Sequence, residues 1–240
     1  MTAADGRRAV AEFTGTGLLV AVVVGSGISA TRLTDDAAVR LLVNSLVTAM
    51  GLAVLILIFS PSGGAQFNPV VTAADWLLSR RTGHRYGAGL AAMVMASQVT
   101  GAIGGAALAD AMFAEPALSV SGHHRGGGPV LLSEVVATAG LLLLIVTLAR
   151  TGRTQHAPWS VGAWIGAAYW FTASTSFANP AVTIGRMLTS TYAGIAPASV
   201  PAFIAMQLLG AAAGTCLAIA TTPARAAAAG RAPEPAHLAG

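Results

Sequence analysis

Two short stretches decide the fold: Asn68-Pro69-Val70-Val71-Thr72 and Asn179-Pro180-Ala181-Val182-Thr183. They stand 111 residues apart and carry Asn, Pro, Val and Thr at equivalent positions. Asparagine is a preferred helix N-cap, and proline is favoured at the first helical position. Each stretch therefore predicts the start of a short helix, one over residues 69–79 and the other over 180–190.

The sequence around these stretches has the composition of a membrane protein. Of 240 residues, 55% are hydrophobic and only 9% are charged, and the mean hydropathy is +0.70. A soluble domain carries about 25% charged residues. The composition therefore excludes an ordinary cytosolic enzyme and a disordered chain. No run of arginines could follow a nucleic-acid backbone, and a single cysteine, Cys216, excludes a cysteine-based metal site. We expect no cofactor, no bound metal and no nucleic-acid partner.

Six windows approach the roughly 20 apolar residues that a membrane-spanning helix needs. They run over residues 10–30, 39–59, 86–108, 130–148, 159–174 and 200–221. Nine of the thirteen arginines flank one side of these spans, and the other side has four: Arg32, Arg40, Arg125 and Arg186. The positive-inside tendency then predicts a multi-pass protein of the inner (plasma) membrane with both termini in the cytoplasm. We expect one domain over residues 1–222 and a disordered tail over 223–240.

The two halves of the chain, about residues 9–109 and 130–222, form an internal repeat. Glu12 opens the first span as Glu134 opens the fourth, and Gln98 in the third span matches Gln207 in the sixth. Three spans per half is an odd number, so the second half must be inverted relative to the first. Such folds place their sites near the midplane, where the two short helices would meet end to end.

A meeting of two helix starts has chemical consequences. A helix of about 11 residues crosses only about half of a ~30 Å hydrocarbon core. Two helix N-termini would bring about +0.5 charge each to one spot, which repels cations. The amides of Asn68 and Asn179 could donate hydrogen bonds to a passing neutral oxygen. The pattern thus favours a pore. Two ordinary Asn-Pro turns are the alternative, and the matched repeat positions argue against it.

On these residues the chain resembles the aquaporin (major intrinsic protein) family, from Glu12 to about Thr221. The resemblance implies an all-α membrane protein with six transmembrane helices and two re-entrant half-helices in an inverted repeat. It also implies a homotetramer in the lipid bilayer, with one pore per subunit for passive flow of water and small neutral solutes. The implied pore-motif residues are Asn68, Pro69, Val70, Asn179, Pro180 and Ala181.

The chain departs from the family pattern at two positions. Val70 replaces the usual alanine, and Val182 replaces an arginine that normally follows the second motif and narrows the filter. Matching the other filter positions gives Ser176 from the loop. In the second span, direct counting gives Thr48, and using the Gly51-Leu52 pair as the anchor gives Met50. In the fifth span, counting back from Asn179 gives Ala167, and Tyr169 is the match if the following loop is shorter than usual.

Replacing a guanidinium with an isopropyl group makes a filter wider and less polar. The run from Ser176 to Ile184 looks like a bacterial branch linked with metalloid transport. We therefore expect solutes larger than water, such as polyols or neutral metalloid hydroxides like arsenous acid. The alternatives are a strict water channel and, less favoured, a secondary transporter, because inverted repeats and broken helices also mark that class.

Arg186 could replace the missing cation, because it lies about two helical turns after Asn179 and returns to nearly the same face. The favoured interpretation is that it extends to the outer interface, as arginines at membrane boundaries do. Glu12 and Glu134 could form a general acid–base pair, but we expect them to accept hydrogen bonds from backbone N–H groups of the re-entrant loops. His123 and His124 are more typical of a solvated loop than of a metal site.

Overall fold

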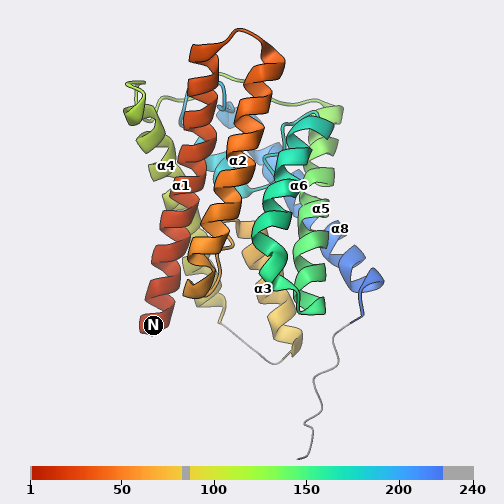
Figure 1. Cartoon of the computed structure of the whole chain (residues 1–240). Helices are drawn as coiled ribbons and strands as arrows, with labels where there is room; N and C mark the ends of the chain where they lie inside the picture. Colours follow the sequence, from red (N-terminus) through yellow and green to blue (C-terminus); the bar gives the residue numbers. More distant parts are fainter. Residues whose placement is uncertain (1, 83–86, 224–240) are drawn as a thin grey trace, which may run out of the picture.

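A computed structural model describes residues 2–82 and 87–223. Its described part is all-helical, as the sequence predicts, and Figure 1 shows the long helices side by side in one bundle. Three 3-10 turns join them: η1 (Ser60–Ser62), η2 (Thr154–His156) and η3 (Pro197–Ser199). The α-helices are α1 (Ala3–Leu33), α2 (Ala37–Phe59), α3 (Pro69–Thr82), α4 (Ala88–Met112), α5 (Gly128–Thr151), α6 (Ala157–Phe171), α7 (Pro180–Arg186) and α8 (Val200–Thr221).

Five of the described helices are long and apolar enough to span a membrane: α1, α2, α4, α5 and α8. The remaining predicted window, 159–174, is the fifth along the chain and holds α6, which has only 15 residues. At 1.5 Å per residue α6 is about 22 Å long, shorter than the ~30 Å hydrocarbon core. The fifth span is therefore shorter than the other spanning helices.

Helix boundaries differ from the predicted windows where local caps extend a helix into polar sequence. The first helix begins at Ala3 rather than at residue 10, because Thr2 and Asp5 form a reciprocal capping box. The Thr2 N–H donates to the Asp5 carboxylate at 2.7 Å, and the Asp5 N–H donates to the Thr2 hydroxyl at 3.2 Å. The predicted disordered tail, apart from Pro223, lies outside the described residues, as do His84 and Arg85.

The packing repeats between the two halves. Helix α1 packs along α4 in the first half as α5 packs along α8 in the second, and α2 meets α6 between them. Two glycines permit the close approach of the paired helices. A Cβ atom on Gly105 would lie 2.0 Å from the carbonyl oxygen of Gly17, and one on Gly214 would lie 2.0 Å from that of Ala139. Figure 1 shows the start of α1 and the end of α8 at the same end of the bundle.

The two predicted short helices are α3 and α7, and each begins at the proline of its motif. Helix α3 runs three residues beyond the predicted residue 79, but α7 ends at Arg186, four residues before the predicted 190. Helix α7 stops because its last carbonyls are taken by other segments. The Ile195 N–H donates to the Arg186 carbonyl at 3.2 Å, and the Ser121 N–H donates to the Met187 carbonyl at 2.9 Å.

Candidate functional site

The two motif asparagines lie together in the middle of the molecule. The Asn68 side-chain amide donates to the Ala178 carbonyl at 2.8 Å, and the Asn179 amide donates to the Phe67 carbonyl at 2.7 Å. The side-chain oxygen of Asn179, Oδ1, also caps α7 by accepting the N–H of Ala181 at 3.0 Å. An amide group has two N–H donors, and both asparagines line a cavity, so each has a second donor for a molecule in that space.

The loops that precede the asparagines have matched left-handed backbone. Ala65 and Ser176, each three residues before its asparagine, have φ of 51° and 50°. Phe67 and Ala178, each one residue before, have φ of 50° and 48°. Such conformations cost a non-glycine residue about 1–3 kcal/mol and persist only where surrounding contacts impose them. They turn the backbone so that each loop presents a carbonyl to the opposite asparagine.

Glu12 holds the first of these loops from behind. Its buried carboxylate accepts the N–H of Gln66 at 2.9 Å and that of Phe67 at 2.7 Å. The amide of Gln98 donates to the same carboxylate at 2.8 Å and to the Thr72 hydroxyl at 2.9 Å. The carboxylate thus satisfies two backbone donors of a loop whose irregular backbone leaves them without partners in a helix.

Glu134 makes the equivalent contacts in the second half. It accepts the N–H of Phe177 at 3.0 Å and that of Ala178 at 2.9 Å. The Gln207 amide donates to it at 2.7 Å and to the Thr183 hydroxyl at 2.9 Å. Both carboxylates are fully buried, with 0% exposure, and neither lines the cavity. A general acid or base must reach its substrate, so this geometry opposes the acid–base interpretation.

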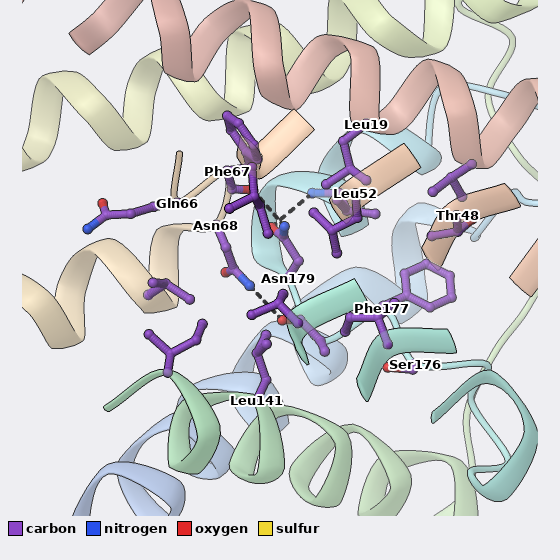
Figure 2. A pocket seen from close by; sticks show the side chains of 18 of the residues that line it. Leu19, Thr48, Leu52, Gln66, Phe67, Asn68, Leu141, Ser176, Phe177 and Asn179 are labelled. Carbon is purple, nitrogen blue, oxygen red and sulfur yellow. Dashed lines mark hydrogen bonds between the residues drawn. The ribbon is translucent and has the colours of Figure 1, made fainter. Parts of the chain in front are cut away.

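A cavity of about 120 Å³, enough for several water molecules, passes beside the asparagines. Figure 2 shows Asn68 and Asn179 near its middle, with Gln66 toward one end and Thr48 and Ser176 toward the other. Most of the wall is apolar, and the polar side chains on it are Thr48, Gln66, Asn68, Tyr169, Ser176, Asn179 and Arg186. Among the described residues, no three His, Cys, Asp or Glu side chains gather as a metal site would require. Such a wall, apolar with a few polar groups, can pass a small neutral solute.

The sequence matches the model of the family described as major intrinsic protein over residues 2–178. This chain belongs to the major intrinsic protein family. It is 50% identical over 205 residues to the aquaglyceroporin AqpS of Rhizobium meliloti (strain 1021), and the match covers 85% of each chain. The X-ray structure of the aquaglyceroporin from Plasmodium falciparum is similar in fold, with a TM-score of 0.67, 15% identity, and coverage of 89% of this chain and 94% of that one.

Family membership confirms three predictions. The chain is a multi-pass helical membrane protein, it is a channel for water and small neutral solutes, and it is not an enzyme. The likeness to the Plasmodium structure concerns the fold alone, because the sequence identity is low.

The structure corrects one of the expected filter positions of this major intrinsic protein. Ala167 is exposed on α6 and does not line the cavity, whereas Tyr169 is 2% exposed and lines it. Two residues turn a helix by about 200°, so they lie on nearly opposite faces. Thr48 lines the cavity, 3.3 Å from the Tyr169 hydroxyl, whereas Met50 is 51% exposed. Ser176 and Val182 also line the cavity, on the loop and on α7.

Arg186 does not extend to the membrane interface, so the favoured interpretation was wrong. It is 2% exposed and lines the cavity. Its guanidinium carbon lies 3.5 Å from the centre of the Phe177 ring, and its Nε donates to the Ala193 carbonyl. The segment after α7 folds back over the helix end and covers this side chain, which the sequence of α7 alone does not reveal.

Arg125, in the segment between α4 and α5, contacts the same ring. Its guanidinium carbon lies 5.2 Å from the centre of Phe177, and it donates to the carbonyls of Gly194 at 2.9 Å and Tyr192 at 3.2 Å. Burial lowers the pKa of the Arg125 guanidinium, but arginine stays protonated in proteins. Two cations therefore contact the Phe177 ring, and of these Arg186 lines the cavity.

Sequence reasoning missed the polar cluster at the opposite end. The Gln66 amide oxygen accepts from Arg8 at 3.2 Å and from the Thr72 hydroxyl at 2.7 Å, and its nitrogen donates to Asp75 at 2.8 Å. Arg8 also lies 3.7 Å from the Asp75 carboxylate. Arg8 and Gln66 are 58 residues apart, and no motif in the sequence links them.

Proposed function

We propose that this major intrinsic protein passes solutes larger than water, namely polyols or neutral metalloid hydroxides such as arsenous acid. The observation that carries the proposal is the position of Val182. This side chain lines the cavity three residues after Asn179, where the family resemblance expects an arginine. An isopropyl group occupies less of the passage than a guanidinium and leaves no charge at that level. The relative in Rhizobium meliloti bears the name aquaglyceroporin, which agrees with this solute class.

The proposed passage combines an apolar wall with few hydrogen-bond donors. Thr48, Tyr169, Ser176 and Val182 are the proposed filter, and Asn68 and Asn179 are the proposed central donors. A polyol can turn its hydroxyl groups toward one side of its carbon chain and its C–H groups toward the other. A mostly apolar wall with a few polar side chains can bond the hydroxyl groups and contact the C–H groups. Small-molecule sites in proteins have this composition.

Purified protein in liposomes tests the proposal by stopped-flow light scattering. We expect water, glycerol and arsenous acid to cross faster than they cross empty liposomes. Water permeability without glycerol or arsenous acid flux would reject the proposal and support the strict water channel. Flux that saturates and depends on an ion gradient would instead support a secondary transporter.

We also propose a topology and an assembly. The start of α1 and the end of α8 lie at one end of the bundle, and the arginine bias assigns that end to the cytoplasm of a cell whose plasma membrane holds the chain. Residues 1–222 form one domain, and residues beyond it form a cytoplasmic tail. Protease treatment of spheroplasts should spare epitope tags at both termini.

We propose a homotetramer, as the family resemblance implies. Residues of a single chain line the whole cavity, so assembly is not needed to complete a pore. Large apolar side chains are exposed on the spanning helices and could face lipid or another copy, among them Leu42, Leu46 and Leu132. Native mass spectrometry from detergent should give four chains per particle.

A further inference from the structure

A guanidinium remains in the cavity wall although Val182 occupies the expected arginine position. Arg186 follows Val182 by four residues on α7, so the two side chains lie on the same face, about 6 Å apart along the axis. Both line the cavity. The cation has thus moved about one helical turn from the level of Val182, toward the end of the cavity that contains Phe177.

The surroundings of Arg186 hold it in place without neutralising it. The Phe177 ring and the Ala193 carbonyl contact its guanidinium. Arg125 fixes the segment that carries this carbonyl, because it donates to the residues on either side, Tyr192 and Gly194. Within residues 2–82 and 87–223, neither Arg186 nor Arg125 forms an ion pair with a carboxylate.

The terminal nitrogens of Arg186 are available to a solute. Among the contacts of the described residues, the side chain donates one hydrogen bond, from Nε. The Nη groups donate none there, and they are not sealed in the protein interior. Arg186 lines the cavity, so its guanidinium lies within reach of a molecule in that space. The hydroxyls of Tyr169 and Thr48, which lie within 3.3 Å of each other, line the same cavity.

We infer that Arg186, held against Phe177, adds a cation to the proposed filter of Thr48 and Tyr169, one helical turn beyond the level of Val182. This inference rests on the proposed channel function and adds its specificity-determining cation. A neutral solute presents hydroxyl oxygens that accept from the Nη groups. A cation meets an unpaired positive charge in a confined, largely apolar space, where Coulomb repulsion is weakly screened. Because Arg186 is one turn away from Val182, the passage stays wide at the level of Val182 and the charge barrier is still present.

The test compares Arg186→Gln and Arg186→Lys with the unmodified chain in liposomes. Arg186→Gln removes the charge and should raise potassium leak, followed with a potential-sensitive dye, by about tenfold. The glycerol-to-water permeability ratio should fall about fivefold, as expected for the loss of one good hydrogen-bond donor set. Arg186→Lys keeps the charge but lacks the planar guanidinium with its several N–H donors. It should therefore remain impermeable to potassium but show the lower glycerol-to-water permeability ratio.

Arg40→Gln is the matched control. Arg40 lies in the first turn of α2, pairs with Asp35 at 2.7 Å and does not line the cavity. Arg40→Gln removes one positive charge outside the passage, so its potassium leak and its glycerol-to-water permeability ratio should equal those of the unmodified chain. An Arg186→Gln protein that conducts water but shows neither leak nor a changed solute ratio would overturn the inference. If Arg186→Gln does not fold, an unchanged solute ratio in Arg186→Lys overturns it instead.

The leak measurement also separates this inference from the proposed function. If the unmodified chain passes water but no glycerol, the proposed solute class fails. The potassium leak of Arg186→Gln then still decides whether Arg186 supplies the charge barrier.

Discussion

Asn68 and Asn179 each donate to the loop that carries the other: Asn68 to the carbonyl of Ala178 at 2.8 Å and Asn179 to that of Phe67 at 2.7 Å. The exchange joins the inverted halves at their centre. Each asparagine uses its carbonyl oxygen on its own helix and one N–H on the opposite loop, so the second N–H is left for the cavity. The pair therefore positions the donors and fastens the two loops together.

Replacing either asparagine with aspartate tests this exchange. Asn68→Asp keeps an oxygen that can cap α3 but has no donor for the Ala178 carbonyl, and it places a negative charge against that carbonyl. We expect a loss of about 1–3 kcal/mol in unfolding free energy, as for a buried hydrogen bond left unmade. Asn179→Asp should lose a similar amount. Thermal unfolding in detergent measures both, and a large loss in one variant with none in the other would contradict the equivalence of the halves.

The two buried glutamates are predicted to act on loop structure. Glu12→Gln and Glu134→Gln each remove a charged acceptor and turn an NH₂ group toward backbone donors that need an acceptor. Each should lower the stability of the folded protein by about 2–4 kcal/mol, seen as a lower melting temperature. Glu115→Gln is the control, because Glu115 pairs with Arg32 at a partly exposed site where an ion pair contributes about 0–1 kcal/mol. Equal melting temperatures for all three variants would refute the loop-holding role.

Val182 is predicted to control solute size. Val182→Arg adds a bulky cation on the same helix face as Arg186, four residues before it, and should reduce glycerol permeability at least about tenfold while water still passes. Val182→Leu adds bulk without charge and should reduce glycerol permeability by less. Stopped-flow measurements on the same liposome preparations give both rates. Undiminished glycerol flux in Val182→Arg would show that the constriction lies elsewhere.

Tyr169 and Ala167 provide a paired test of the corrected filter position. Tyr169→Phe removes a hydroxyl 3.3 Å from that of Thr48 in the cavity wall, and we expect the glycerol-to-water ratio to fall a few-fold, consistent with one hydrogen bond of about 1 kcal/mol. Ala167→Leu changes an exposed position on α6 and should leave the ratio unchanged. If Ala167→Leu changed the glycerol-to-water ratio and Tyr169→Phe did not, Ala167 would be the filter residue, as counting along the sequence predicts.

The features that sequence reasoning predicted are those with local causes. An Asn-Pro pair caps a helix wherever it occurs, so the starts of α3 and α7 could be predicted. The end of α7 could not, because its last carbonyls bond Ile195 and Ser121 from other segments.

The same distinction explains the errors at the site. Ala167 was chosen by counting back from Asn179, and the count depends on how the chain turns after α6, which residue types alone do not specify. Arg186 is expected at the interface because it lies about two helical turns beyond Asn179, well above the expected constriction. Its burial depends on Phe177 and on Ala193, which reaches it from beyond the helix end.

Two adjacent glycines on α4 offer the sharpest test of the helix packing. A Cβ on Gly105 would lie 2.0 Å from the Gly17 carbonyl oxygen, and this neighbour is backbone that cannot rotate away. Gly105→Ala must therefore push α1 and α4 apart, and we expect little folded protein after purification. Gly104→Ala meets nothing within 4 Å and should purify as well as the unmodified chain, with a gain of up to about 1 kcal/mol from helix propensity. Monodisperse, water-conducting Gly105→Ala would mean that the two helices are farther apart than described.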